Sequence, residues 1–200
     1  MRSKLSGYIH AGLAALLVCA VSAAQAAGSY GEDRALIEDL QARYLFALDF
    51  QDAEAYAGTF TEDGVLDYGM GQIRGRKAIQ DMVSGLRTRA KETAAKDTSG
   101  LRPAAGRHSI TNIVIKVTGD KATSVAYWSH AGNNNAERKA GLDSYGHYED
   151  ELVKVKGEWL FSKRKIYNEV VAEWSAAGAP NPAVHPGPGP KLRKPATGTN

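Results

Sequence analysis

The chain has 200 residues, a formal net charge of +3 and one cysteine, Cys19. A single cysteine excludes an internal disulfide framework, and no basic patch with interleaved aromatic residues indicates a nucleic-acid partner. The length suffices for one hydrophobic core of ordinary size.

The first 26 residues have the layout of a secretory signal peptide. Arg2 and Lys4 precede an apolar run over 11–21, and Ala24-Gln25-Ala26 is a small-x-small cleavage pattern. The apolar run is too short to span a bilayer. We therefore expect cleavage after Ala26, a periplasmic or secreted protein and no membrane span after cleavage; a retained anchor or a lipid on Cys19 are the alternatives. Because Cys19 leaves with the leader, the mature chain would have no disulfide, no cysteine nucleophile and no cysteine-ligated metal.

The other end of the chain also differs from a folded domain. Residues 176–200 contain six of the seven prolines, three basic residues and no acidic one. Such a segment cannot bury enough apolar surface to offset its ordering entropy, so we predict a disordered, Pro/Gly-rich basic tail. One domain, over 29–175, remains, with a net charge of about −2 once the leader and tail are removed from the total.

The hydrophobic periodicity of this domain changes along the chain. Helical spacing comes first and strand alternation dominates later, which favours an α+β fold with helices on one face of a curved antiparallel sheet. In chain order we expect a helix over 31–52, a short helix over 53–60, a turn over 61–64, short strands within 65–75, a helix over 76–90, a polar loop over 91–106, and strands over 108–118, 121–131, 142–156 and 159–171.

Asp49 and His108 are the candidate acid–base pair. Asp49 ends the first predicted helix among large apolar neighbours, where a carboxylate needs a partner or must lose its charge. His108 begins a strand, and an Asp–His pair can act as a general base. The alternative is that Asp49 starts a turn and His108 is a solvated strand end. The spacing of the histidines does not indicate a metal site, and His147 is expected to be a hydrogen-bonded residue of the sheet.

Several segments carry a resemblance to a known family. They are "YLFALDFQDAEAYAGTFTEDGVLDYG", "GRKAI", "RHSITNIVIKVTGDKAT" and "GHYEDELVKVKGEWLFSKR". With these segments, most of 33–167 resembles SnoaL-like proteins of the NTF2-like superfamily, which includes scytalone dehydratase, ketosteroid isomerase and hexachlorocyclohexane dehydrochlorinase. The resemblance implies a cone-shaped fold with about three helices on the concave side of the sheet. It is weak evidence for one reaction, because this fold supports many.

The resemblance also implies roles for individual residues. Asp49 and His108 match the catalytic dyad of the dehydrochlorinase and of scytalone dehydratase. Asn112 follows His108 in the dehydrochlorinase pattern, and Tyr68 matches a water-holding tyrosine of scytalone dehydratase. Leu48 stands where that enzyme has a second tyrosine, which argues against the same dehydration.

Further residues are candidates for supporting or substrate-binding roles. The resemblance places His130 near the second pocket histidine of scytalone dehydratase and Lys163 at a basic pocket position of the dehydrochlorinase. Strand alternation puts Trp128 on the face of His130, Tyr145 on that of His147, and Lys163 on that of Phe161. For Tyr68, Trp128 and Tyr145 a core position is the simpler interpretation and pocket lining is the alternative, and Tyr44 is a further candidate for a supporting role.

These observations lead to two functional hypotheses. The first is a cofactor-independent lyase or isomerase, without a metal, in which Asp49 and His108 remove a proton from a small, largely apolar molecule, aromatic ones included. Tyr68, His130 or Lys163 would then stabilise charge or protonate the leaving group, in elimination of water or halide or in release of formaldehyde. The second is a non-catalytic domain for small-ligand binding or assembly. In either case a homodimer or homotrimer is expected.

Overall fold

The computed structural model describes residues 30–68, 71–170 and 180–184. The leader predicted over 1–26 and most of the tail predicted over 176–200 lie outside the described residues. Within the described part of the chain, no helix is long and apolar enough to cross a membrane.

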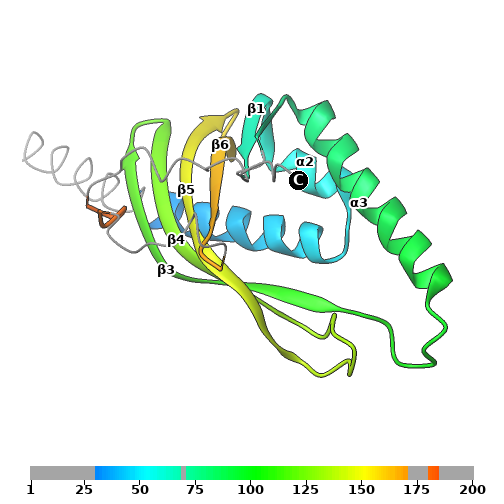
Figure 1. Cartoon of the computed structure of the whole chain (residues 1–200). Helices are drawn as coiled ribbons and strands as arrows, with labels where there is room; N and C mark the ends of the chain where they lie inside the picture. The colour runs from blue at the N-terminus through cyan, green and yellow to red at the C-terminus, as the bar shows by residue number, and fades with distance from the viewer. Residues whose placement is uncertain (1–29, 69–70, 171–179, 185–200) are drawn as a thin grey trace, which may run out of the picture.

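Three helices cover one side of the sheet (Figure 1). The first, called here the N-terminal helix, is described over 30–49, and it places Ile37, Leu40 and Tyr44 at helical spacing in the core. The short α2 (Ala53–Gly58) begins at Asp52, whose side chain accepts a hydrogen bond from the Ala55 amide. In the long α3 (Arg76–Lys96), only the side chains of Ile79 and Val83 are buried.

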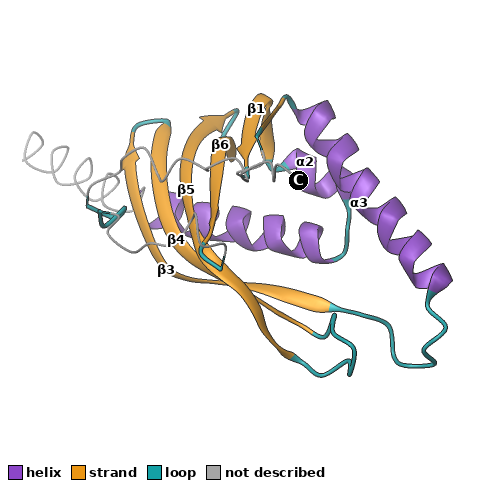
Figure 2. Cartoon of the chain, viewed as in Figure 1, coloured by secondary structure: helices purple, strands orange, loops and turns teal. Residues whose placement is uncertain are grey.

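Six strands form one curved sheet in the order β2-β1-β6-β5-β4-β3. The strands are β1 (Phe60–Asp67), β2 (Gln72–Arg74), β3 (Gly106–Thr118), β4 (Lys121–Gly132), β5 (Gly141–Val155) and β6 (Glu158–Asn168). The N-terminal helix lies in the concavity of the long strands β3 to β6, and α2 and α3 lie towards the β1–β2 edge (Figures 1 and 2). We call the side of the sheet that faces the N-terminal helix the inner face and the opposite side the outer face.

Three details differ from the sequence-based expectations. The sheet is mixed, because β1 pairs in parallel with β6 while every other pair is antiparallel. The predicted turn over 61–64 is instead part of β1. The register of β1 with β6 shifts between Phe60 and Val65, so the Asp-Gly sequence marks a β-bulge and not a turn. The helix predicted to end at residue 90 continues to Lys96, because exposed Ala, Glu and Lys residues favour helix without any apolar spacing.

The inner face carries the main core of the described domain. Phe60, Phe161 and Tyr148 pack there against Tyr44 of the N-terminal helix. Trp128 lies in the same layer, its ring stacked at 6.0 Å on Tyr148. The core therefore extends along the inner face of β4 towards the end at which His108 and His130 lie.

Candidate active site

Asp49 is the last helical residue of the N-terminal helix. Backbone bonds from Phe50, Gln51 and Asp52 to carbonyls of the last turn close the helix, and Gln51 has a positive φ of 54°. A carboxylate here sits at the negative end of the helix dipole, so donors must come from elsewhere. The side chain of Asp49 is only 6% exposed, which makes those donors necessary.

His108 supplies both donors. The Asp49 carboxylate accepts from the His108 backbone amide at 3.0 Å through Oδ2, and its Oδ1 lies 2.6 Å from His108 Nδ1. The strand β3 lies at the edge of the sheet, so its outward amides have no neighbouring strand to bond. Asp49 therefore also satisfies an amide that the sheet leaves unpaired. A proton on Nδ1 leaves the lone pair of neutral His108 on Nε2.

His130 stands directly across from His108. The two residues are cross-strand partners on the inner face, and their ring centroids are 4.5 Å apart. The ring of Trp128, one inner position further along β4, lies 6.1 Å from that of His108. An indole wall and two imidazoles thus line the same part of the inner face.

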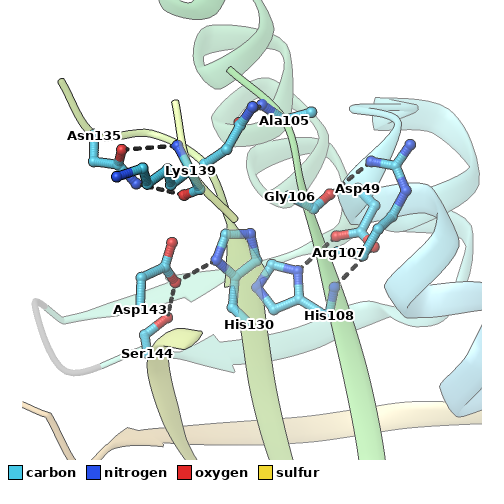
Figure 3. A network of polar contacts seen from close by, with 11 residues as sticks. Asp49, Ala105, Gly106, Arg107, His108, His130, Asn135, Lys139, Asp143 and Ser144 are labelled. Carbon is cyan, nitrogen blue, oxygen red and sulfur yellow. Dashed lines mark hydrogen bonds and ion pairs between the residues drawn. The ribbon is translucent and has the colours of Figure 1, made fainter. Parts of the chain in front are cut away.

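A second carboxylate, that of Asp143, binds His130. Asp143 Oδ1 lies 2.5 Å from His130 Nδ1, and this hydrogen bond is the main reason why the pKa of Asp143 is lowered. Figure 3 shows the two imidazoles between the carboxylates of Asp143 and Asp49. Asp143 is not among the site residues predicted from the sequence.

A β-bulge explains why Asp143 was missed. Alternation from Tyr145 and His147 would put Asp143 on the outer face. However, His130 pairs with Ser144 and Ala131 pairs with Leu142, so Asp143 is an extra residue in β5. The bulge turns its side chain towards His130. A bulge of this kind has no sequence signal in "GLDSYG" beyond its small and polar residues.

Two glycines make room for the His130 ring. Gly106 and Gly132 are cross-strand partners next to the histidine pair. A Cβ on Gly106 would lie 2.1 Å from His130 Nε2, and a Cβ on Gly132 would lie 2.7 Å from Asp143 Oδ2. Neither distance is tolerable for real atoms, so only glycine at both positions permits this arrangement.

Lys163 and Tyr145 lie away from the histidine pair. Tyr145 pairs with Ser129 on the outer face and is 47% exposed. Lys163 was expected to share a face with Phe161, but the register shift opposite Glu151 and Leu152 leaves Ser162 as an extra residue and turns Lys163 outward. There Lys163 lines a hollow of about 280 Å³ on the outer face.

The other predicted residues occupy separate places. Tyr44 is fully buried, and its hydroxyl oxygen accepts a hydrogen bond from the Tyr56 hydroxyl at 2.7 Å. Asn112 is exposed at a bulge in β3 with a φ of 52°, and Tyr68 is 37% exposed at the end of β1. His147 bonds Glu169 through Nδ1 at 2.7 Å, as expected for a satisfied residue of the sheet.

Among the residues that the structure describes, no three His, Cys, Asp or Glu side chains are grouped so that they could hold a metal ion. What the arrangement can do chemically is move protons. An imidazole whose Nδ1 is held by a carboxylate keeps Nε2 as the atom that can accept or return a proton.

Comparison with known proteins places this chain in a family. The model of the SnoaL-like domain matches residues 30–165, and the chain therefore belongs to the SnoaL-like family, whose members are often cofactor-independent isomerases or dehydratases. Solved structures with an NTF2-like, cystatin-like fold are similar, which confirms the predicted fold class and family resemblance. No curated protein matches the chain.

Three solved structures illustrate the similarity. A Mycobacterium tuberculosis protein of unknown function is 28% identical, with a TM-score of 0.60, over 74% of this chain and 78% of its own. A candidate scytalone dehydratase from Novosphingobium aromaticivorans is 26% identical, with a TM-score of 0.54, over 68% and 83%. ActVI-ORFA from Streptomyces coelicolor is 21% identical, with a TM-score of 0.58, over 70% and 98%, and shows the fold alone.

Proposed function

We propose that the protein is an exported, cofactor-independent lyase or isomerase in which Asp49 and His108 form the general base. Its substrate is a small, largely apolar molecule with an acidic C–H or O–H bond. The observation that carries the proposal is the double contact of Asp49 with His108, at 2.6 Å to Nδ1 and 3.0 Å to the backbone amide. This contact supports a general base because it orients the ring and leaves Nε2 for the substrate.

The buried Asp49 carboxylate also stabilises the protonated form of His108 that the reaction produces. When His108 takes a proton on Nε2, the new imidazolium lies against the Asp49 carboxylate, which is 6% exposed and held by the helix end. The positive charge therefore forms beside a fixed negative charge in a site with little water. The Trp128 ring beside His108 offers an apolar surface for the substrate.

The family supports elimination or isomerisation as the reaction class. A similar structure carries the name of a candidate scytalone dehydratase, which supports loss of water as one reaction of this type. Loss of halide or formaldehyde would use the same proton abstraction. The distance between His108 and Asp49 bears directly on the first step that these reactions share.

The test is elimination from a simple probe. β-Chloropropiophenone has an acidic proton next to its carbonyl and loses chloride to form phenyl vinyl ketone, which can be followed by its absorbance. We expect His108→Asn to lower kcat/KM by roughly 10²–10⁴, as for loss of a general base. Lys163→Met is the matched control and should leave the rate unchanged, because Lys163 lies on the outer face.

Equal rates for the unaltered protein and His108→Asn would contradict the proposal. If the folded protein nevertheless bound propiophenone, the non-catalytic binding domain would become the better description. Circular dichroism of each variant would show that the comparison is made between folded proteins.

We also propose export and assembly. Export is supported by the basic, apolar and small-x-small order of residues 1–26, and N-terminal sequencing of the mature protein would test cleavage after Ala26. Assembly into a homodimer or homotrimer is supported by the apolar side chains that Val114, Tyr127 and Tyr145 expose on the outer face.

A further inference from the structure

A short turn from the C-terminal part of the chain lies against the outer face of the sheet. We call this turn, residues 180–184, the strap; Figure 1 shows it in orange beside β3. Pro182 and Ala183 in the middle of the strap are half-buried, whereas Pro180 and Val184 at its ends are exposed. Pro182 and Ala183 line the hollow of about 280 Å³ on the outer face, together with residues of β3, β4, β5 and β6. The outer face therefore shields the middle of the strap from solvent.

The sequence of the strap favours this turn. Asn181 Oδ1 accepts a hydrogen bond from the Ala183 amide at 3.0 Å, and the Asn181 carbonyl accepts one from the Val184 amide at 3.2 Å. Asparagine at the first position of such a turn and proline at the second are preferred residues. Because Pro182 also restricts the undocked chain, the strap loses little conformational entropy when it docks on the sheet.

The surface around the hollow fits a segment that is neutral and apolar. Val114 and Val125, which are cross-strand partners, line its β3–β4 side. On its other side, the two lysines of β6 lie opposite two glutamates of β5, as Lys163 does with Glu151, and the Nζ and Oε1 atoms of that pair are 3.7 Å apart. These charges are balanced within the face itself. The strap, which has no charged side chain, therefore adds no unpaired charge to this surface.

We propose that the outer face is the docking surface for the strap of the same chain, and that the docked strap competes with assembly of protomers through this face. The competition rests on the proposed assembly, which uses the exposed side chains of Val114 and Tyr127. Val114 lines the hollow next to Pro182, so the strap and a second protomer meet at the same place. A strap that is docked about nine-tenths of the time weakens the apparent affinity between protomers about tenfold.

Cross-linking tests whether the strap docks on its own chain. Val114→Cys and Ala183→Cys are combined with Cys19→Ser, which removes the only native cysteine. We expect a short bismaleimide to join the two new cysteines within one chain. The control replaces Val114→Cys by Thr88→Cys, an exposed position on α3, which lies towards the opposite edge of the sheet, and should give little product. A link between two chains, or equal yields from both pairs, would overturn the docking.

A charge in the strap tests the competition. Pro182→Asp puts a carboxylate where a half-buried apolar ring lies, and this should release the strap. Sedimentation velocity over a concentration series should then show an apparent Kd between protomers that is lower by about three- to tenfold. Pro180→Asp is the matched control, because it makes the same change at an exposed residue two positions earlier, and it should leave the Kd unchanged.

The outcomes separate the docked strap from the proposed assembly. If the two aspartate variants change the Kd equally or not at all, or if Pro182→Asp weakens association, the strap does not compete with assembly and that part of the proposal is wrong. If all three proteins are monomers at every concentration while the link within one chain forms, the proposed assembly fails together with the competition, whereas the docked strap stands.

Discussion

Arg164 is fully buried beneath the N-terminal helix, and its charge is balanced by Asp150. Both guanidinium–carboxylate contacts measure 2.8 Å, and Ser124 donates a further hydrogen bond to Asp150 at 2.7 Å. The guanidinium carbon lies 4.1–4.2 Å from the ring centroids of Tyr44, Tyr148 and Phe161. This pair connects β5, β6 and the helix that carries Asp49.

Removing one partner of this pair should be strongly destabilising. Asp150→Ala leaves the Arg164 charge buried without its counter-ion, and we expect a loss of about 3–5 kcal/mol in the free energy of unfolding. Urea unfolding followed by tryptophan fluorescence measures the change. The control is Asp81→Ala, which removes an exposed pair with Lys77 and should have no measurable effect. Equal unfolding midpoints for Asp150→Ala and the unaltered protein would show that the pair does not stabilise the core.

At the scale of elements, β-bulges decide which side chains reach the site. The bulge in β5 brings Asp143 to His130, and the irregularity of the β5–β6 pair sends Lys163 to the outer face. A third shift, in β3, places Asn112 in a left-handed conformation with a φ of 52°. Each bulge changes the alternation of every residue beyond it, so strand parity holds only between bulges.

The pairing of β5 with the end of β6 should make stability depend on pH. Burial of His147 lowers its pKa, but two carboxylates outweigh this effect, so the pKa is raised above 6.5. Glu149 lies 3.7 Å from the ring Nε2, and Glu169 is hydrogen-bonded to Nδ1 at 2.7 Å. A histidine with a raised pKa stabilises the fold fully below its unfolded value and loses that contribution as pH rises through its folded value.

His147→Gln should therefore cost most stability at acidic pH. We expect the difference in unfolding midpoint between the unaltered protein and His147→Gln to be largest below pH 6.5 and to shrink as pH rises above 6.5. The stacking of His147 on Tyr167, at 4.3 Å between ring centroids, adds a loss that does not depend on pH. Thermal unfolding of both proteins over a pH series measures this, and a difference that grows with rising pH would reverse the assigned sign.

At the scale of the whole molecule, the outer face of the sheet exposes several apolar side chains, although Pro182 and Ala183 line a hollow there beside Val114. Tyr127 is 53% exposed there, Tyr145 is 47% exposed and Val114 is 40% exposed. A stable dimer interface buries roughly 1,200–2,000 Å² in total, an area that one face of a six-stranded sheet can supply. We expect sedimentation velocity to show a dimer or trimer that Tyr127→Glu weakens.

A matched variant distinguishes this face from exposed apolar surface in general. Leu101→Glu changes a residue of similar exposure, 47% against 53% for Tyr127, in the loop between α3 and β3, and should leave the assembly intact. A monomer at every concentration tested, or equal dissociation by both variants, would argue against assembly through the outer face.

Features of this molecule that depend on residues close together in the sequence could be predicted, and those that depend on distant residues could not. The helices and the long strands follow from local periodicity, and the predicted bounds of the four C-terminal strands differ from the observed ones by few residues. The exceptions were features whose local signal was ambiguous. Asp63-Gly64 reads as a turn but forms a bulge, and residues 91–96 are polar but helical.

In the candidate site, the pair of Asp49 and His108 could be predicted, whereas the pair of Asp143 and His130 could not. Asp49 and His108 stood out because a carboxylate among large apolar side chains needs a partner, and the family resemblance named the same two residues. Asp143, as the extra residue of a bulge, was not predictable from alternation. Tyr44 and Asn112 were assigned supporting roles, but the structure shows one as a core residue and the other as an exposed bulge residue.

The sequence by itself determined the α+β class and the order of the elements, because hydrophobic periodicity acts through neighbouring residues. It also made Asp49 and His108 candidates, which the family resemblance joined into a pair. Only the tertiary structure decided that a second Asp–His pair lies beside the first and that Lys163 and Tyr145 face away. Those outcomes depend on strand register and on bulges, which the whole sheet sets by packing against the N-terminal helix. A shift of one residue in register reverses the face of every side chain beyond it.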